Sequence, residues 1–178
     1  HHNTNHSNQI GGNTVNKIKF GVFLPFYAFK TREHFDQVRD VVMECEQLGY
    51  DSIWLDDHLM FEKRSILECW TTLAALSAVT SKIRLGTMVL CNGFRNPALL
   101  AKMAATLDVV SEGRLELGIG AGVQEDEHVA YGIPFHKPLA RISRLKETVE
   151  IIKKMWTQEK TSYTGKYYRV SEAVCEPK

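Results

Sequence analysis

Short apolar runs alternate with longer amphipathic segments along the chain from Lys17 onward. The runs are rich in β-branched and large apolar residues and end at turn-forming or polar residues, which predicts buried strands. Four such strands are expected: Ile18–Leu24, Ser52–Leu55, Ile83–Leu90 and Leu115–Ile119. Their starts recur about every thirty residues, as in a βαβ array, so the pattern predicts an α/β fold with a parallel sheet.

The amphipathic segments carry apolar residues at three- and four-residue spacing, which predicts helices between the strands. Thr31 can cap the first helix, and Gly49 stands where a helix often ends in a left-handed residue. Asn96 and Pro97 form a cap and first-turn pair for the third helix. The expected helices run from Thr31 to Gly49, through Trp70 to Ala78, from Asn96 through Val110 and from about Leu139 to Trp156.

The last stretch, Thr161–Val170, alternates aromatic and polar residues around Gly165 and predicts a hairpin outside the repeat. Four βα units are too few to close an eight-stranded barrel, which normally takes about 250 residues. The repeat is therefore either an open four-stranded sheet or half of a barrel. Half of a barrel would leave two strand edges unpaired, so under that interpretation the chain is a fragment.

Composition places the chain among ordinary globular proteins with one core. It has 178 residues, of which 44% are apolar and 24% are charged. A formal net charge of +1 without a long basic run gives no reason to expect nucleic acid or an anionic membrane as a partner. No apolar run approaches the roughly 18 to 20 residues of a membrane span, and no secretory leader is recognisable.

The four cysteines lie far apart, with neither a C-x-x-C pair nor a zinc-type cluster, so a reducing, cytoplasmic location is expected. Residues 1–16 are almost all polar or glycine and cannot form a core. We interpret them as a disordered leader or the remnant of a tag, and residues 17–178 as the folded domain. The lack of an initiating Met suggests a sequence cut from a longer one.

Ligands of parallel α/β folds bind beyond the carboxyl ends of the strands, so the loops there are the places to look for chemistry. Asp56, Asp57 and His58 follow the second strand. A carboxylate beside an imidazole can poise the ring for proton transfer near neutral pH, which predicts a proton-handling pair at a pocket floor. Helix capping and solvated loop charge are the competing interpretation.

The glycine-rich exit of the fourth strand, Gly118–Gly122, allows a flat or anionic ligand to approach the backbone closely. Tight-turn packing is the competing interpretation, and the spacing is not the dinucleotide fingerprint, whose third glycine comes one residue later. The acidic run Glu125–His128 does not predict a metal cluster, because consecutive helical residues point to different faces. Charge at a helix N-terminus accounts for it better.

Four stretches together resemble the bacterial-luciferase-like superfamily: GVFLPF, EQLGYDSIWLDDHLM, SAVTSKIRLGTMVL and FRNPALLAKMAATLDVVSEGRLELGIGAGVQEDEHVAYGIPF. The resemblance runs almost unbroken from residue 17 to 178 and includes the later GKYYRV. It implies a (β/α)8 barrel of which this chain covers about the first four βα units. A fifth strand would follow shortly after Lys178, the later strands would supply most contacts to the cofactor phosphate, and the full-length protein would be a homodimer.

One branch of the superfamily uses reduced FMN and oxygen, and another uses the deazaflavin F420 for hydride transfer. The Asp-His pair after the second strand is similar to the F420 branch. The resemblance also implies a bulge in the third strand with a non-proline cis peptide, Met88–Val89, behind the cofactor ring. The cofactor contacts that it implies are Asp57, His58, Thr87, Met88, Val89, Ala121 and Gly122.

The implied reaction is F420-dependent hydride transfer to or from a small organic substrate, with His58 and Asp57 as catalytic candidates and His58 as the acid/base or cofactor-orienting residue. Some F420 enzymes carry an acidic residue directly after the glycines, where this chain has Val123. That departure argues against sugar-phosphate dehydrogenation of their type. Three alternatives stay open: an FMN-dependent monooxygenase, a non-catalytic flavin-binding half-barrel, and a metal-dependent hydrolase using Asp56, Asp57 and His58, which lacks ligands from other strands.

Overall fold

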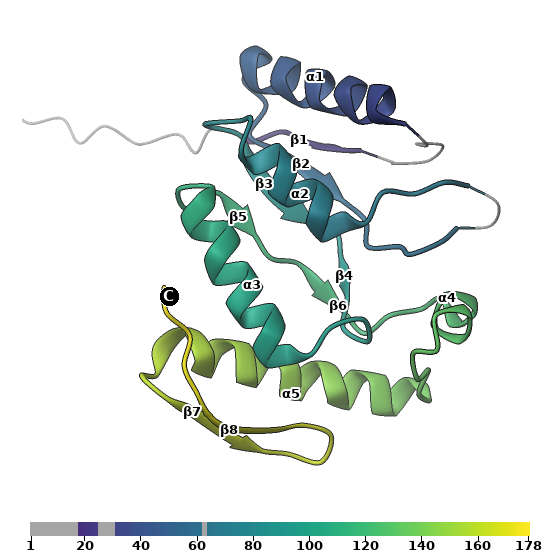
Figure 1. The fold of residues 1–178 in the computed structure, drawn as a ribbon, viewed down its shortest axis with the longest axis vertical. Helices are drawn as coiled ribbons and strands as arrows, with labels where there is room; N and C mark the ends of the chain where they lie inside the picture. Colours follow the sequence, from purple (N-terminus) through teal and green to yellow (C-terminus); the bar gives the residue numbers. More distant parts are fainter. Residues whose placement is uncertain (1–17, 25–30, 62–63) are drawn as a thin grey trace, which may run out of the picture.

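The predicted parallel sheet forms with its strands in chain order (Figure 1). The computed structural model describes residues 18–24, 31–61 and 64–178, so the expectation for residues 1–16 lies outside the described part. The four strands of the main sheet are β1 (Gly21–Phe23), β2 (Ser52–Leu55), β3 (Arg84–Thr87) and β5 (Leu115–Glu116). Every neighbouring pair is parallel, which confirms the βαβ interpretation of the sequence pattern.

The helices follow the strands as predicted. They are α1 (Arg32–Leu48), α2 (Cys69–Ser77), α3 (Pro97–Val110), the short α4 (Glu125–Ala130) and α5 (Pro138–Thr157). Gly49 ends α1 in the left-handed conformation with φ 82°, and the Asn96 side chain accepts hydrogen bonds from two backbone N–H groups at the start of α3. Thr31 stands at the N-cap of α1 but makes no capping hydrogen bond through its side chain.

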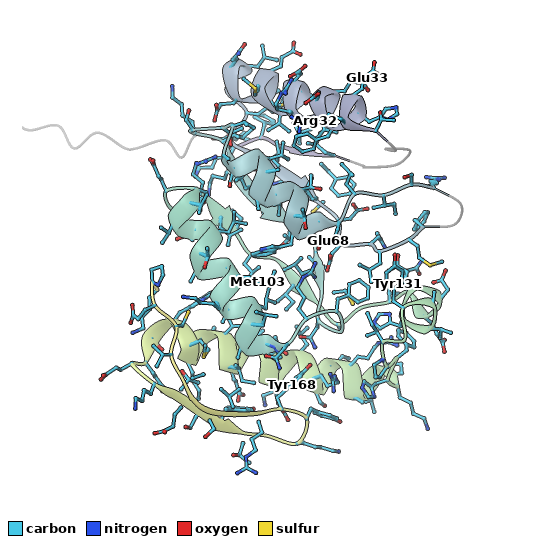
Figure 2. All side chains as sticks on the ribbon, in the orientation of Figure 1. Arg32, Glu33, Glu68, Met103, Tyr131 and Tyr168 are labelled. Carbon is cyan, nitrogen blue, oxygen red and sulfur yellow. The ribbon has the colours of Figure 1, made fainter. Side chains whose placement is uncertain are left out.

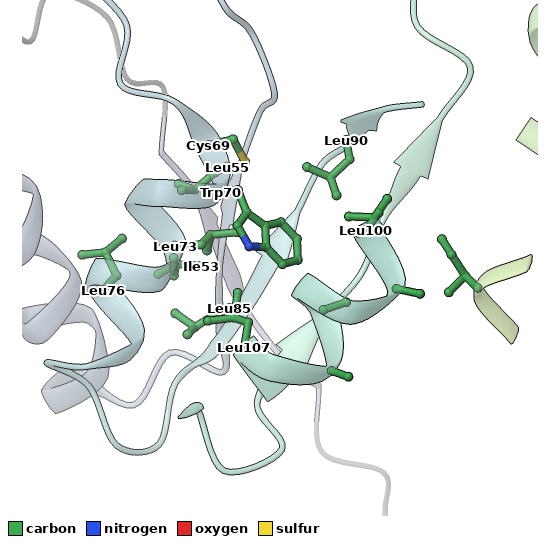
Figure 3. Packing of buried hydrophobic residues seen from close by; sticks show 14 of the residues in the cluster. Ile53, Leu55, Cys69, Trp70, Leu73, Leu76, Leu85, Leu90, Leu100 and Leu107 are labelled. Carbon is green, nitrogen blue, oxygen red and sulfur yellow. The ribbon is translucent and has the colours of Figure 1, made fainter. Parts of the chain in front are cut away.

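Alternation along β2 divides the sheet into two faces. Ile53 and Leu55 are fully buried and join Leu85 of β3 in the core beneath α2 and α3 (Figure 3). On the opposite face the Trp54 indole lies so close to Gly86 that a Cβ there would come within 2.2 Å of the ring. Glycine is required at this position because a side chain would displace the indole.

Two predicted strands are each broken into two pieces. Ile83–Leu90 divides into β3 and β4 (Leu90–Cys91), and Leu115–Ile119 divides into β5 and β6 (Ile119–Gly120). β4 and β6 pair with each other in a separate parallel sheet. Hydrophobic periodicity did not predict the breaks, because Leu90 beyond the first break is as buried as Leu85 before it.

The break in the third strand coincides with a cis Met88–Val89 peptide, which confirms the expectation from the resemblance. The Thr87 hydroxyl donates to the Gly118 carbonyl over 2.7 Å and accepts the Gly118 N–H over 3.0 Å. This buried side chain therefore ties the two broken strands together at the level where both change direction.

The predicted hairpin is present as antiparallel β7 (Thr161–Thr164) and β8 (Arg169–Ala173). It lies beside α5, and the Glu147 carboxylate on that helix accepts three backbone N–H groups from residues 166–168 of its turn (Figure 1). Trp156 also joins α5 to α3 by donating from its indole to the Ala101 carbonyl. None of the helices within the described ranges is long and apolar enough to cross a membrane.

Candidate active site

A cavity of about 390 Å³ opens beyond the carboxyl ends of the strands, where the sequence pattern predicted chemistry. Its walls come from the loop after β2, the β4 segment, the exit of β6 and α4. The described lining residues are Asp56–His58, Met88–Cys91, Phe94, Gly120–Gln124, Glu127 and His128. Six of the seven predicted contact residues therefore line one cavity, and Thr87 does not, because its hydroxyl is engaged by Gly118.

His58 is held by a carboxylate that the sequence analysis did not single out. Its Nδ1 lies 2.8 Å from Oε1 of Glu127, 69 residues further along the chain on α4. The His58 side chain keeps 22% of its surface exposed towards the cavity, whereas that of Glu127 keeps 2%. Burial raises the pKa of Glu127 above its usual range, and the hydrogen bond from His58 opposes that shift.

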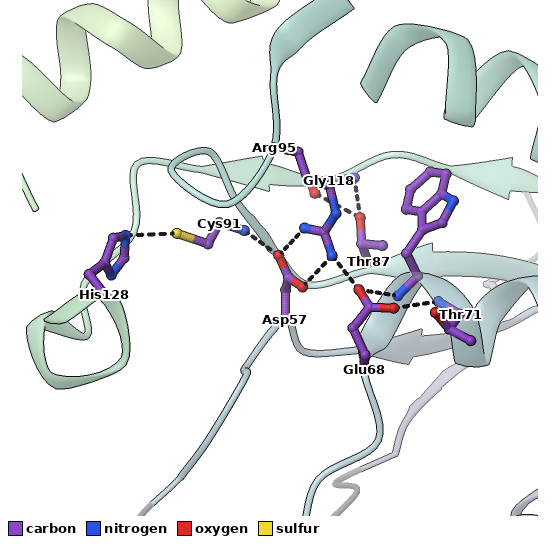
Figure 4. Close-up of polar contacts among 9 residues, drawn as sticks. Asp57, Glu68, Thr71, Thr87, Cys91, Arg95, Gly118 and His128 are labelled. Atoms are coloured by element: carbon purple, nitrogen blue, oxygen red, sulfur yellow. Dashed lines mark hydrogen bonds and ion pairs between the residues drawn. The ribbon is translucent and has the colours of Figure 1, made fainter. Parts of the chain in front are cut away.

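Asp57 belongs to a different network (Figure 4). The prediction that Asp57 and His58 pair with each other is therefore wrong. Its fully buried carboxylate accepts two bonds from the Arg95 guanidinium, with N···O distances of 2.6 and 2.9 Å, and a third from the Cys91 N–H. The physical reason is that consecutive residues leaving an extended strand point to opposite sides. His58 reaches the cavity, while Asp57 turns behind it towards Arg95.

Arg95, just before α3, connects three parts of the fold because it binds two carboxylates from other segments. Besides Asp57 it binds Glu68, which caps α2 by accepting from the backbone N–H groups of Trp70 and Thr71 (Figure 4). Burial works to lower the pKa of Arg95, but its hydrogen bonds and charge interactions with Asp57 and Glu68 outweigh that effect and raise it. The guanidinium is therefore a permanent cation behind the cavity wall.

A second histidine closes the α4 side of the cavity. Nδ1 of His128 lies 2.7 Å from the Gln124 carbonyl, which can only accept, so this nitrogen carries the proton. Its other ring nitrogen, Nε2, lies 3.6 Å from the Cys91 sulfur. Burial raises the pKa of Cys91 to about 11, so the residue is a neutral thiol at neutral pH and not a nucleophile.

The run Glu125–His128 begins α4, in agreement with the interpretation as helix N-terminal charge. Only two of its members, Glu127 and His128, are buried and face the cavity, because helical geometry turns Glu125 and Asp126 to solvent. Tyr131, just beyond α4, donates its hydroxyl proton to the Leu59 carbonyl and joins α4 to the loop after β2 (Figure 2). Nothing in the sequence distinguishes Glu127 from Glu125, so reasoning from sequence missed it.

The remaining wall suits a flat apolar ring. Met88 and Val89 on either side of the cis peptide are about half exposed, at 49% and 47%. Opposite them the chain approaches so closely that a Cβ on Gly120 would come within 2.7 Å of the Val89 side chain. Gly122 has φ +82°, and a Cβ there would lie 2.7 Å from the Cys91 sulfur.

The charges around the cavity do not suit a phosphate group. Its described lining contains three carboxylates and two imidazoles but neither Lys nor Arg. Cationic side chains are the usual partners of phosphate oxygens. The described cavity therefore fits the ring of a flavin-type cofactor better than its phosphate. No group of three or more His, Cys, Asp or Glu residues in the described ranges is arranged to hold a metal ion.

Comparison with known sequences places these features in a family. The family model described as luciferase-like monooxygenase matches residues 18–178. An F420-dependent glucose-6-phosphate dehydrogenase of Kineococcus radiotolerans is 36% identical over 141 residues, which are 77% of this chain and 42% of that protein. The enzyme of the same name from Segniliparus rotundus is 34% identical over 160 residues, covering 88% and 47%. The chain thus spans about half the length of these curated relatives.

Solved structures agree with the sequence comparison. The monooxygenase RslO1 from Streptomyces bottropensis matches with a TM-score of 0.80 and 28% identity, over 90% of this chain and 49% of that one. An F420-dependent secondary alcohol dehydrogenase in complex with an F420–acetone adduct matches with a TM-score of 0.77 and 25% identity, over 90% and 48%. The chain belongs to the luciferase-like monooxygenase family and forms about half of its (β/α)8 barrel.

Proposed function

We propose that this chain supplies the ring-binding side of the site of an F420-dependent oxidoreductase, which transfers hydride to or from a small organic substrate. The observation that carries the proposal is that His58, the Met88–Val89 peptide and the glycines of the β6 exit line the same cavity. The consecutive residues Asp57 and His58 after β2, which resemble the F420 branch in sequence, and the F420-dependent relatives favour F420 over FMN.

The residues of this chain would divide the work in a simple way. Met88, Val89 and Phe94 would exclude water from one side of the ring, and the glycines would let the ring approach the backbone. F420, when bound, supplies hydride chemistry. His58 would accept or return the proton that accompanies it, because its Nε2 makes no hydrogen bond within the described part of the chain.

The lining also points to a class of substrate. The acidic residue that some F420 enzymes carry directly after the glycines is replaced by Val123, which is 74% exposed at the rim. With carboxylates and no described Lys or Arg around it, this side of the cavity would disfavour an anionic substrate. We therefore propose a neutral alcohol or carbonyl compound rather than a sugar phosphate.

An FMN-dependent monooxygenase is the second candidate. It is favoured by the apolar wall of Met88, Val89 and Phe94, because oxygen chemistry on a flavin needs a dry site. The similarity to the monooxygenase RslO1 points the same way.

Cofactor titration tests the proposal and separates the candidates. The purified protein is titrated with F420 and, separately, with FMN, and the change in cofactor fluorescence is followed. Tighter binding of F420 is expected. Tighter binding of FMN would favour the monooxygenase, and binding of neither would overturn both proposals.

A matched pair of variants tests where the ring binds. Gly122→Ala places a methyl group against Cys91 in the cavity, whereas Gly132→Ala meets nothing within 4 Å. Both glycines have positive φ, 82° and 68°, so the backbone cost of the substitutions is similar. Gly122→Ala should weaken cofactor binding and Gly132→Ala should not. Equal binding by the two variants would place the ring elsewhere.

The role of His58 is tested by His58→Asn with a panel of alcohols and ketones. Loss of a general acid/base lowers turnover by about 10² to 10⁴. We expect that loss in kcat, with cofactor affinity nearly unchanged. A variant that binds the cofactor and keeps wild-type kcat would exclude His58 from proton transfer.

A further inference from the structure

Glu127 is a buried acid on α4, and within the described residues its charge is favoured by the ring of His58 and by a backbone hydrogen bond at Met60. It is unusual for an acid to be this buried without a permanent cation beside it. Arg95, the guanidinium behind the cavity wall, is engaged by Asp57 and Glu68 instead. His58 is therefore the side chain that compensates the buried charge of Glu127.

We propose that Glu127 is the positioning residue of this site: its carboxylate fixes His58 with the proton on Nδ1 and the lone pair of Nε2 facing the cavity. The catalytic consequence rests on the proposed function, whereas the positioning itself does not. A carboxylate accepts hydrogen bonds only, so Nδ1, at 2.8 Å, must donate to it. The neutral ring then has a single basic atom left, Nε2.

The two histidines of the cavity show why this arrangement matters. Both have a Nδ1 fixed by an oxygen acceptor, Glu127 for His58 and the Gln124 carbonyl for His128. Nε2 of His128 faces the Cys91 sulfur and is closed off between the rings of Phe94 and Phe135. His58 also lines the cavity, but it has a carboxylate on Nδ1 and its Nε2 makes no hydrogen bond within the described residues, so of the two it is the one equipped for proton transfer.

The proton balance of this pair is straightforward. When a proton leaves a substrate hydroxyl, it passes to Nε2 of His58 and makes the ring an imidazolium. Glu127 does not take the Nδ1 proton but balances the new positive charge across the 2.8 Å hydrogen bond. In the reverse direction Nε2 returns the proton to the substrate oxygen. Burial strengthens this interaction because little water screens it.

Other charged groups surround the pair and define the background for any pH measurement. They come from each element packed around it: Asp56 and Asp57 after β2, Cys91 on β4, Arg95 before α3, and Asp126 and His128 on α4. Of these, Asp57 and Arg95 neutralise each other. A substitution of Glu127 therefore changes the charge beside His58 without disturbing that ion pair.

The positioning is tested by ¹⁵N NMR of the histidine side chains in the purified protein without cofactor. Wild type should show neutral His58 protonated on Nδ1. Glu127→Ala should change the tautomer, whereas Glu127→Gln should keep it, because the amide oxygen can still accept from Nδ1. Glu125→Gln, the same change on the solvent side of α4, should resemble wild type. The same tautomer in wild type and Glu127→Ala would overturn the proposal.

Turnover measurements test the catalytic consequence separately. In metal sites, loss of the outer partner of a ligating histidine typically costs about 10 to 100-fold, and a comparable loss is expected for a carboxylate that orients a catalytic histidine. We expect Glu127→Ala to lose kcat to that extent with little change in KM. Glu127→Gln should keep the orientation of the ring but still lose part of kcat, because the imidazolium formed during turnover loses its counter-charge. If the tautomer changes in Glu127→Ala but wild type shows no F420-dependent turnover, the proposed function is rejected and the positioning role stays intact. A wild-type kcat in Glu127→Gln would reject the charge-balancing role.

Discussion

Asp57 and His58 are adjacent in the chain, yet they serve opposite sides of the same cavity wall. Asp57 turns into the protein and is locked by the Arg95 guanidinium, a permanent cation, so its charge is always compensated. His58 lines the cavity and pairs with Glu127 over 2.8 Å, and imidazole is the side chain most often used for proton transfer in enzymes. The Asp57–Arg95 pair is suited to stabilise the fold, and the His58–Glu127 pair is suited to transfer a proton.

The end of β3 shows the same division. Thr87 is fully buried and holds Gly118 of the neighbouring broken strand, whereas the next two residues, Met88 and Val89, are half exposed at the cavity. In both strands the residue directed inward fixes the backbone, and the residue that follows it faces the ligand side. The comparison teaches that a cluster of functional-looking residues at a strand end has to be divided by side-chain direction before roles are assigned.

The largest effect on stability is expected at the Asp57–Arg95 pair, which faces into the protein. Arg95→Met leaves the buried carboxylate of Asp57 without its cation, with only the hydrogen bond from the Cys91 N–H among the described partners, and such a loss costs about 3–5 kcal/mol. We expect the free energy of unfolding in urea to fall by that amount. Arg32→Met, which removes the exposed ion pair with Asp36, should change it little and is the control. Equal losses in the two variants would show that the Arg95 network is not structural.

A smaller effect is expected at Thr87. Thr87→Val leaves the Gly118 N–H without its partner and removes one of the two hydrogen bonds that the Gly118 carbonyl accepts, the other coming from the Leu90 N–H; this costs about 1–3 kcal/mol. Thr87→Ser keeps the hydroxyl and should recover part of the loss. Thr106→Val, at an exposed hydroxyl on α3, is the matched control. Urea unfolding of the three variants measures the difference, and a Thr87→Val protein as stable as Thr106→Val would contradict the bridging role.

The smallest effect, and the most specific to the cavity side, is a change in the pH dependence of stability. Burial raises the pKa of Glu127, so its favourable contribution is present at low pH and is lost as the pH rises through that pKa. His58→Ala removes a hydrogen bond that lowers the pKa of Glu127, so the loss of stability with rising pH should grow. As the pH rises above the usual range of a carboxyl group, the variant should therefore lose more stability than wild type.

The control for this measurement is the double variant His58→Ala/Glu127→Gln, since a glutamine cannot titrate. Its stability relative to wild type should lack the extra decline with pH. If the double variant declines as steeply as His58→Ala, another group is responsible and the link between His58 and Glu127 is wrong.

Sequence reasoning went far for the fold and part of the way for the site. The order of strands, the cap at Asn96, the helix end at Gly49 and the terminal hairpin followed from local signals. The cis Met88–Val89 peptide came from the family resemblance rather than from the residues themselves. The two strand breaks were missed because buried residues continue on both sides of each break, and periodicity reports burial rather than direction.

The site shows the limit more clearly. The tripeptide Asp56-Asp57-His58 indicated where chemistry would lie but not which acid pairs with the ring. The partner, Glu127, stands on α4 among other acids, and only the packing of that helix against the loop after β2 selects it. Arg95 was likewise missed, because a single basic residue before a helix carries no local sign that it is buried.

The repeat of strands and helices, and the edge of the sheet at which the candidate residues gather, could be predicted from the sequence, because they follow from local periodicity and from the parallel direction of the strands. The tertiary structure alone decided that Asp57 belongs to Arg95 and His58 to Glu127. The physical reason is that a charge pair depends on distance and burial, and residues 38 and 69 positions apart acquire these only when the fold brings them together.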